Sequence, residues 1–295
     1  MIIDMRCRPT IPELGNYFAE VSKKVFHSYD SIKGFKNPTM EGFFEEIGEC
    51  GITTAVAPYG NSPGIKIGRH VMPARTASND VMADLNRRHW GKFVGVAGID
   101  AGNVYHSALQ EIERCAKLGL RAVFIEPGRS PGCDLDDRRL YPIYEKCVEL
   151  DLTLMPQTTG VLGGRNIDYA NPRHLDQVAA DFPDLRIIAG HCCYPYGREA
   201  IVVGGRHENV YLSPDDTVFR LGTEDWIKAV NMNLHDCQNK FIFASAYPAR
   251  PLKGVVDAFL KLSWKPEALP KILYKNALRA LKLEEDPVFK EMYAA

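Results

Sequence analysis

Two arginines one residue apart, Arg6 and Arg8, end the opening segment MIIDMRCR, which has the pattern of a β-strand. With period two, this strand has an apolar face and a face that becomes charged toward its end: Ile3, Met5 and Cys7 against Ile2, Asp4, Arg6 and Arg8. Two guanidiniums at a strand end form a fork that can bind a carboxylate or phosphate through paired hydrogen bonds. We therefore expect a small anionic ligand at Arg6 and Arg8. The alternative is a buried ion network with acidic neighbours such as Asp4, Asp100 or Glu126.

Four other residues are candidates for the same site. His191 ends an apolar run, and its ordinary pKa of about 6.5 suits a general acid or base at neutral pH. Flanking arginines would favour its neutral form. Glu126, which precedes Pro127, would either neutralise the arginines or act as a second catalytic base. Gln157 and Tyr194 would contact the substrate, although each of the four also has an ordinary structural explanation.

Two further pairs of residues follow the expected strands. A thiol of Cys192 or Cys193 close to histidine and arginine would have a lowered pKa, but adjacent cysteines in loops are usually inert. Asp215 and Asp216 have the pattern of a solvated turn. We therefore expect neither pair to carry the chemistry.

Composition narrows the class of protein. The chain has 295 residues and a net charge of −1, which gives no electrostatic reason to bind nucleic acid or an anionic membrane. No apolar run approaches the roughly 20 residues needed to span a bilayer, and a signal peptide is not expected because an acidic residue stands at position 4. The eight cysteines have no disulfide-framework spacing, so we expect reduced thiols and a cytoplasmic protein.

Short β-branched runs alternate with helix-period segments along the whole chain. Eight strands are expected to begin near Ile2, Thr53, Phe93, Arg121, Leu152, Arg186, Val210 and Phe241. Helices are expected over 40–50, 79–90, 104–118 and 137–150. This order predicts an α/β fold, a (β/α)₈ TIM barrel in one domain over 1–295, with a doubly wound sheet as the alternative. Residues 14–38 form an aromatic-rich insertion that would be a lid over the barrel mouth, a surface insertion or a subunit contact.

Several stretches resemble, in order and spacing, the amidohydrolase-related (amidohydrolase 2) family of metal-dependent hydrolases. They are RRHWGKFVGVAGID at 87–100, the helix 140–150 followed by LTLMPQTTG, FPDLRIIAGH at 182–191, FASAYP at 243–248 and LYKNALRAL at 273–281. The resemblance implies a TIM barrel with a metal site at its mouth. It places the two histidines of the first strand at Arg6 and Arg8, the fifth-strand histidine at Gln157 or Thr158, the sixth-strand histidine at His191 and the eighth-strand aspartate at Ala246.

That correspondence removes most of the metal ligands. Arginine offers only donors, so Arg6 and Arg8 cannot bind a cation, and Ala246 has no ligand atom. A catalytic zinc needs about three protein ligands, whereas only His191 remains. We therefore expect no metal cofactor.

The resemblance implies an enzyme acting on a small molecule. We expect a metal-independent hydrolase of a small carboxylate-bearing metabolite such as a lactone or ester, with His191 and Glu126 catalytic and Arg6, Arg8, Gln157 and Tyr194 binding the substrate. The family also implies nonoxidative decarboxylation as an alternative. A non-catalytic protein that binds an anionic metabolite is a further alternative, and a homo-oligomer is possible in each case.

Overall fold

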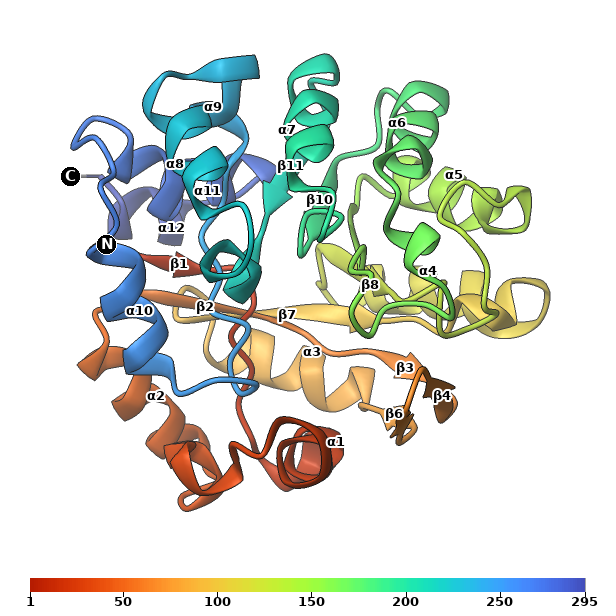
Figure 1. The fold of residues 1–295 in the computed structure, drawn as a ribbon. Helices are drawn as coiled ribbons and strands as arrows, with labels where there is room; N and C mark the ends of the chain where they lie inside the picture. Colours follow the sequence, from red (N-terminus) through yellow and green to blue (C-terminus); the bar gives the residue numbers. More distant parts are fainter. Residues whose placement is uncertain (295) are drawn as a thin grey trace.

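The computed structural model describes residues 1–294, and its centre is a parallel sheet of seven strands (Figure 1). Along the sheet the strands are β1 (Ile3–Asp4), β2 (Thr54–Pro58), β7 (Phe93–Gly98), β8 (Ala122–Ile125), β9 (Thr153–Pro156), β10 (Ile187–Gly190) and β11 (Val210–Ser213). Each begins within one residue of its predicted start. Parallel strands that follow one another in sequence and lie side by side in the sheet must be joined by crossover segments, which are usually helices. This alternation of strands and helices is the barrel arrangement that the sequence predicts.

The segment 241–247 lies between the last strand and the first. The Ile242 N–H donates to the Leu212 carbonyl at 2.8 Å, and the Met5 N–H donates to the Phe243 carbonyl at 3.1 Å. Cys7 and Tyr247 form an isolated parallel bridge. This segment therefore joins the two edges of the sheet by scattered hydrogen bonds, whereas the sequence predicts a regular eighth strand there. Seven of the eight predicted strands are found.

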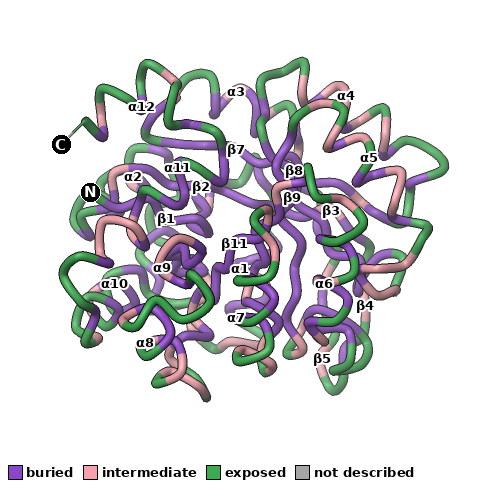
Figure 2. Tube along the Cα trace, turned by 90° about the horizontal axis from the view of Figure 1, so that it is seen from above, coloured by how far each residue is buried: buried purple, intermediate pink, exposed green. Residues whose placement is uncertain are grey.

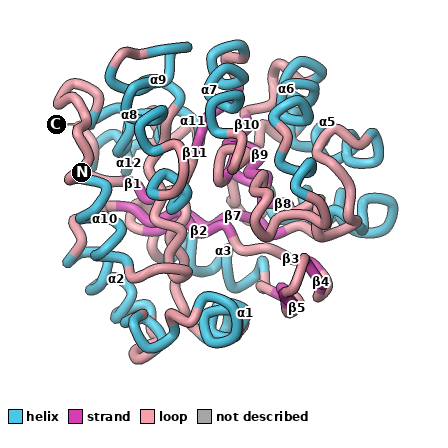
Figure 3. The backbone as a smooth tube through the Cα atoms, viewed as in Figure 1, coloured by secondary structure: helices cyan, strands magenta, loops and turns pink. Residues whose placement is uncertain are grey.

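Helices surround the strands, as Figures 1 and 3 show. They are α1 (Tyr17–Val21), α2 (Met40–Glu49), α3 (Asn79–Arg88), α4 (Leu109–Lys117), α5 (Tyr141–Glu149), α6 (Pro172–Asp181), α7 (Gly197–Arg206), α8 (Thr223–Asn231), α9 (Cys237–Lys240), α10 (Leu252–Leu260), α11 (Asn276–Ala280) and α12 (Pro287–Met292). Local sequence sets their ends: the Ser78 side chain accepts from the Val81 N–H at the start of α3, and Gly51 follows α2 with a φ of 73°. None of the helices in residues 1–294 is long and apolar enough to cross a membrane.

Two groups of buried side chains form the core. The buried residues are concentrated along the central strands, as the colouring of the trace in Figure 2 shows. The inner group contains residues from every strand position of the barrel: Ile3, Met5, Val56, Val94, Val96, Ala122, Phe124, Met155, Ile188, Tyr211, Ile242 and Ala244. The outer group contains alternate residues of the same strands, such as Ala55, Val123 and Leu212, which pack with the helices. Successive side chains of each strand thus point alternately into the barrel and toward the helices.

The opening segment departs from the predicted alternation. Ile3 and Met5 belong to the inner core, and Ile2 belongs to the outer core. The sequence pattern placed Ile2, Asp4 and the two arginines on one face, but in the structure the arginines do not share the face of Ile2. Strand β1 ends at Asp4, and a turn follows at Met5 and Arg6 before the Cys7 bridge. The Asp4 carboxylate stabilises this turn by accepting from the Arg6 N–H at 3.1 Å. The turn shifts the phase, so Cys7 packs in the outer core, apart from Ile3 and Met5, whereas the sequence pattern placed all three on one face.

Two insertions lie after the first two strands of the barrel. Residues 14–38 contain α1 and several single helical turns. The second insertion was not predicted: β3 (Asn61–Ser62) pairs with β6 (Arg75–Thr76), and β4 (Ile65–Ile67) pairs with β5 (His70–Met72), both antiparallel. Both insertions contribute side chains to the pocket described below.

Candidate functional site

A pocket of about 90 Å³ lies where the barrel strands end, and arginines dominate its wall. Six of them line it: Arg6, Arg8, Arg75, Arg129, Arg220 and Arg250. Tyr17, Phe18 and Phe26 of the insertion 14–38 complete one side of the pocket. The pocket lies at the carboxyl end of the strands, where barrel enzymes carry their sites.

Arg6 is buried and pairs with Asp215. Its Nε lies 3.0 Å from Asp215 Oδ2, and its guanidinium lies over the Phe124 ring with 5.3 Å to the centroid. Arg6 Nη1 is buried without a hydrogen-bond partner among the described residues. Gly190 makes room for this group, because a Cβ there would lie 2.7 Å from Arg6 Nη2. The acidic partner is thus Asp215, which differs from the three neighbours considered for the ion network.

Arg8 is held by carbonyl groups. Its Nε donates to the Pro58 carbonyl at 2.6 Å and its Nη1 to the Tyr247 carbonyl at 3.3 Å. Burial, and then the charges of Arg6 and Arg75, lower the pKa of Arg8 to about 9. The guanidinium is therefore still charged at neutral pH but lacks a carboxylate partner in residues 1–294. A bound anion would relieve this repulsion.

His191 lies beside Asp215 at the end of β10. Its Nδ1 is 3.2 Å from Asp215 Oδ2, and the ring lines the pocket. Burial, followed by Arg6 and Arg8, holds the pKa of His191 well below its usual value, so the ring is neutral at pH 7 as expected. Burial also raises the pKa of Asp215 to about 6, although Arg6 and Ser213 oppose the shift.

The prediction of a solvated turn at Asp215 is wrong. Asp215 is 2% exposed, and its backbone has a φ of 56°, which turns the carboxylate inward. Asp216 stays at the rim and pairs with Arg220 at 3.2 Å and Arg250 at 3.5 Å. The pattern Ser-Pro-Asp-Asp is typical of a turn and does not show which of the two carboxylates is buried.

Glu126 is buried between two arginines. Its Oε2 lies 3.1 Å from Arg75 Nε and its Oε1 lies 3.3 Å from Arg129 Nε. The Tyr17 hydroxyl accepts from Arg75 Nη2 and Arg129 Nη1, both at 2.9 Å. Of its two predicted roles, this position suits that of a counter-ion to arginines better than that of a base. Its partners are Arg75 and Arg129, whereas the sequence suggested Arg6 and Arg8.

The remaining candidate residues differ in whether they line the arginine-rich pocket. Gln157 lines the pocket. Its neighbour Thr158 is used structurally, since its Oγ1 donates to the Gly190 carbonyl at 2.8 Å and accepts from the Cys193 N–H at 3.0 Å. Ala246 also lines the pocket. Tyr194 instead lines an adjoining hollow, with the Arg220 guanidinium 5.9 Å from its ring centroid.

The adjacent thiols are not activated. Burial raises the pKa of Cys192 well above its usual range and the pKa of Cys193 to about 12, which is the opposite of the lowered value considered above. Both residues are 1% exposed. The eight cysteines are all free thiols.

Sequence reasoning missed four arginines of the pocket. Arg75 comes from the second insertion, and Arg220 and Arg250 come from loops after β11 and after the segment 241–247. Arg129 had a weak signal, because it stands three residues after Glu126 in the same loop.

The residues at the barrel mouth do not fit the catalytic metal that the family resemblance implies. Arg6 and Arg8 present only donors and fixed positive charge. His191 Nδ1 lies 3.2 Å from Asp215 Oδ2, and Arg6 Nε already lies 3.0 Å from that same oxygen. A cation there would be repelled by the buried guanidiniums.

The fold and the site define an α/β barrel whose mouth holds a buried, arginine-rich pocket beside a neutral histidine. The Amidohydrolase family model matches residues 52–283, so the chain belongs to the amidohydrolase family. An uncharacterized TIM-barrel protein, Bb4693 from Bordetella bronchiseptica, is 32% identical, with a TM-score of 0.84 over 95% of this chain and 98% of that one. A search of curated proteins by sequence found no significant match.

More distant structures share the fold. The dihydroxybenzoic acid decarboxylase from Polaromonas sp. JS666, solved with bound manganese and an inhibitor, is 18% identical with a TM-score of 0.70 over 97% of this chain and 98% of that one. The 4-oxalomesaconate hydratase from Rhodopseudomonas palustris is 20% identical with a TM-score of 0.62 over 99% and 98%.

Proposed function

We propose that the pocket binds a small substrate bearing one or more carboxylates, with Arg6 and Arg8 as its principal partners. The observation that carries the proposal is the environment of Arg8, a buried guanidinium repelled by Arg6 and Arg75 and bonded only to carbonyl oxygens. Six arginines line the pocket, whereas the acidic groups in contact with them there are Glu126, Asp215 and Asp216. The excess positive charge favours a substrate with more than one negative charge.

We propose nonoxidative decarboxylation as the reaction, without a metal. Several proteins of the same fold are named as decarboxylases, which supports this reaction over the hydrolysis first expected. The bond between the substrate carbon and its carboxylate breaks, the electron pair stays on that carbon, and carbon dioxide leaves. The arginines would stabilise the negative charge that spreads onto a conjugated oxygen of the substrate.

The same mechanism requires a proton for the substrate carbon. When Asp215 is protonated, its O–H can donate to His191 Nδ1, and the ring then presents Nε2–H toward the pocket. His191 would deliver this proton to the carbon, and Asp215 would resupply it. This form is populated as the pH falls toward 6, where Asp215 titrates.

Hydrolysis of a lactone or ester is the second candidate, and the same pair of residues favours it at higher pH. His191 Nδ1 lies 3.2 Å from Asp215 Oδ2, so an ionised Asp215 would favour the tautomer with the proton on Nδ1 and leave Nε2 as a base. His191 would take a proton from water as the water attacks the carbonyl carbon. The C–O bond then breaks, and His191 returns the proton to the leaving oxygen.

The test combines binding with product analysis. Wild-type protein is titrated calorimetrically with mono-, di- and tricarboxylates, and each binder is then assayed for released carbon dioxide and for acid produced by hydrolysis. The assays are run with and without a chelator. We expect carbon dioxide from at least one bound carboxylate at an unchanged rate in chelator, and its loss in His191→Asn. Acid release instead would select hydrolysis, and tight binding with neither product would select the non-catalytic alternative. Failure of every carboxylate to bind would overturn the proposal.

A further inference from the structure

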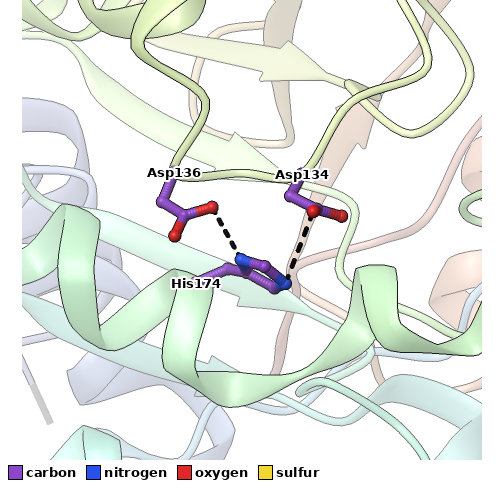
Figure 4. A group of neighbouring side chains, drawn as sticks. All are labelled: Asp134, Asp136 and His174. Carbon is purple, nitrogen blue, oxygen red and sulfur yellow. Dashed lines mark hydrogen bonds and ion pairs between the residues drawn. The ribbon is translucent and has the colours of Figure 1, made fainter.

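A second group of polar residues lies away from the arginine pocket, between the loops that follow β8 and β9. His174, in the first turn of α6, lies between Asp136 and Asp134 of the loop after β8, as Figure 4 shows. Asp168, in the loop after β9, approaches the same ring. None of these residues lines the arginine pocket. The group therefore needs an explanation of its own.

The two nitrogens of His174 have different surroundings. Nδ1 lies 2.6 Å from Asp136 Oδ1, a distance at which the N–H donates to the carboxylate. Nε2 is buried without a hydrogen-bond partner among residues 1–294, and the residue is only 1% exposed. It faces Asp134 Oδ2 and Asp168 Oδ2, each at 3.8 Å. A nitrogen lone pair that faces two carboxylates is repelled unless a cation lies between them.

The local charges leave room for a divalent ion. Three carboxylates surround the imidazole, and the cation found next to them is Arg173, whose nitrogens lie 3.8 Å from Asp136 and Asp168. Three negative charges against one positive charge leave two uncompensated. Two ligand atoms that each bind one zinc ion at about 2.1 Å lie about 3.4 Å apart at the tetrahedral angle. Asp134 Oδ2 and Asp168 Oδ2 each lie 3.8 Å from Nε2, and their side chains, which are 46% and 60% exposed, are free to rotate toward a shared ion.

We propose that His174 Nε2, Asp134 and Asp168 bind one divalent transition-metal ion of the zinc class. Asp136 is the positioning residue, because a carboxylate that accepts from the second ring nitrogen fixes the orientation of a metal-binding histidine. Water would complete the coordination. The ion links the loop that carries Arg129 to the loop that carries Leu162, whose carbonyl accepts from Arg129. Its role is structural, and it goes beyond the proposed catalytic function.

The experiment titrates chelator-stripped, dialysed full-length protein with zinc chloride by calorimetry. We expect one equivalent to bind, with the affinity at least tenfold lower in Asp134→Asn and in Asp168→Asn. Thermal unfolding in excess zinc should shift upward by roughly 5 °C for the wild type and by much less for the double variant. His174→Gln should bind no zinc. If that variant does not fold, the zinc affinities of Asp134→Asn and Asp168→Asn test the proposal instead.

Two controls separate this site from other sources of zinc binding. His207→Gln should bind like the wild type, because His207 Nε2 lies 2.7 Å from a single carboxylate, Asp176. Cys133→Ser removes the half-buried thiol next to Asp134 and should also leave the affinity unchanged. Absence of zinc binding, or equal binding by the wild type and the double aspartate variant, would overturn the proposal.

Discussion

Arg6 Nε lies 3.0 Å from Asp215 Oδ2, and this buried pair joins the first strand region to the loop after β11 across the barrel mouth. His191 Nδ1 approaches the same oxygen at 3.2 Å. One carboxylate oxygen therefore contacts both the fixed charge and the neutral imidazole.

Arg6→Ala should destabilise the fold, because it leaves the Asp215 carboxylate buried without its partner. We expect a loss of about 3 kcal/mol in the free energy of unfolding, measured with urea. The double variant Arg6→Ala, Asp215→Asn should recover part of this loss. If the double variant is as unstable as the sum of the two single variants, the pair is not coupled.

Arg8→Met should weaken ligand binding with less effect on folding, because no carboxylate loses its partner. We expect the affinity for a bound carboxylate to fall roughly thirtyfold, about 2 kcal/mol, as measured by calorimetry. Arg250→Met is the control, since that side chain is 50% exposed at the rim. Equal losses in both variants would show that binding depends on overall charge rather than on Arg8.

Gly190→Ala should displace the Arg6 guanidinium, because the new Cβ would lie 2.7 Å from Nη2. We expect weaker carboxylate binding and a destabilisation of about 1 kcal/mol. Gly254→Ala in α10 meets no atom within 4 Å and should stabilise the protein by roughly 0.5–1 kcal/mol. Unchanged binding in Gly190→Ala would mean that Arg6 does not need its present position.

The pH dependence of stability should reveal two opposing groups between pH 5 and 6. His191 has a folded pKa well below 6.5, so the unfolded chain binds more protons and its contribution to stability falls as the pH falls. Asp215 has its folded pKa raised to about 6, so its contribution is lost as the pH rises. The variant His191→Asn removes the contribution of His191 and leaves that of Asp215. We expect the slope of unfolding free energy against pH to become more negative by up to about 1.4 kcal/mol per pH unit. An unchanged slope would contradict the lowered pKa of His191.

The rate of decarboxylation should rise as the pH falls through about 6, because the proposed proton donor is the form with Asp215 protonated. Asp215→Asn, which cannot ionise, should remove this inflection from kcat. Hydrolysis through a basic His191 would show the opposite trend. A rate independent of pH from 5 to 8 in the wild type would exclude the His191–Asp215 pair from the proton transfer.

The sequence alone determined the order of the elements. Hydrophobic periodicity and turn residues are local properties, so they located seven strand starts within one residue and the C-terminal ends of four helices within two residues. They also placed Arg6, Arg8, Gln157 and His191 at strand ends, and these residues line one pocket. The family resemblance indicated which positions of the barrel would carry metal ligands in relatives.

Only the tertiary structure decided which charges meet. Arg75, Arg129 and Asp215 lie in insertions and loops that carry no periodic signal, yet they fix the partners of Glu126 and Arg6. The turn at Met5 and Arg6 changed the phase of the first strand, because the Asp4 side chain stabilises it through the Arg6 N–H. Ion pairing and burial depend on distances between segments far apart in sequence, and these distances exist only once the barrel closes. The sequence therefore determined that two arginines stand at the barrel mouth, and the fold decided that one is paired and the other is not.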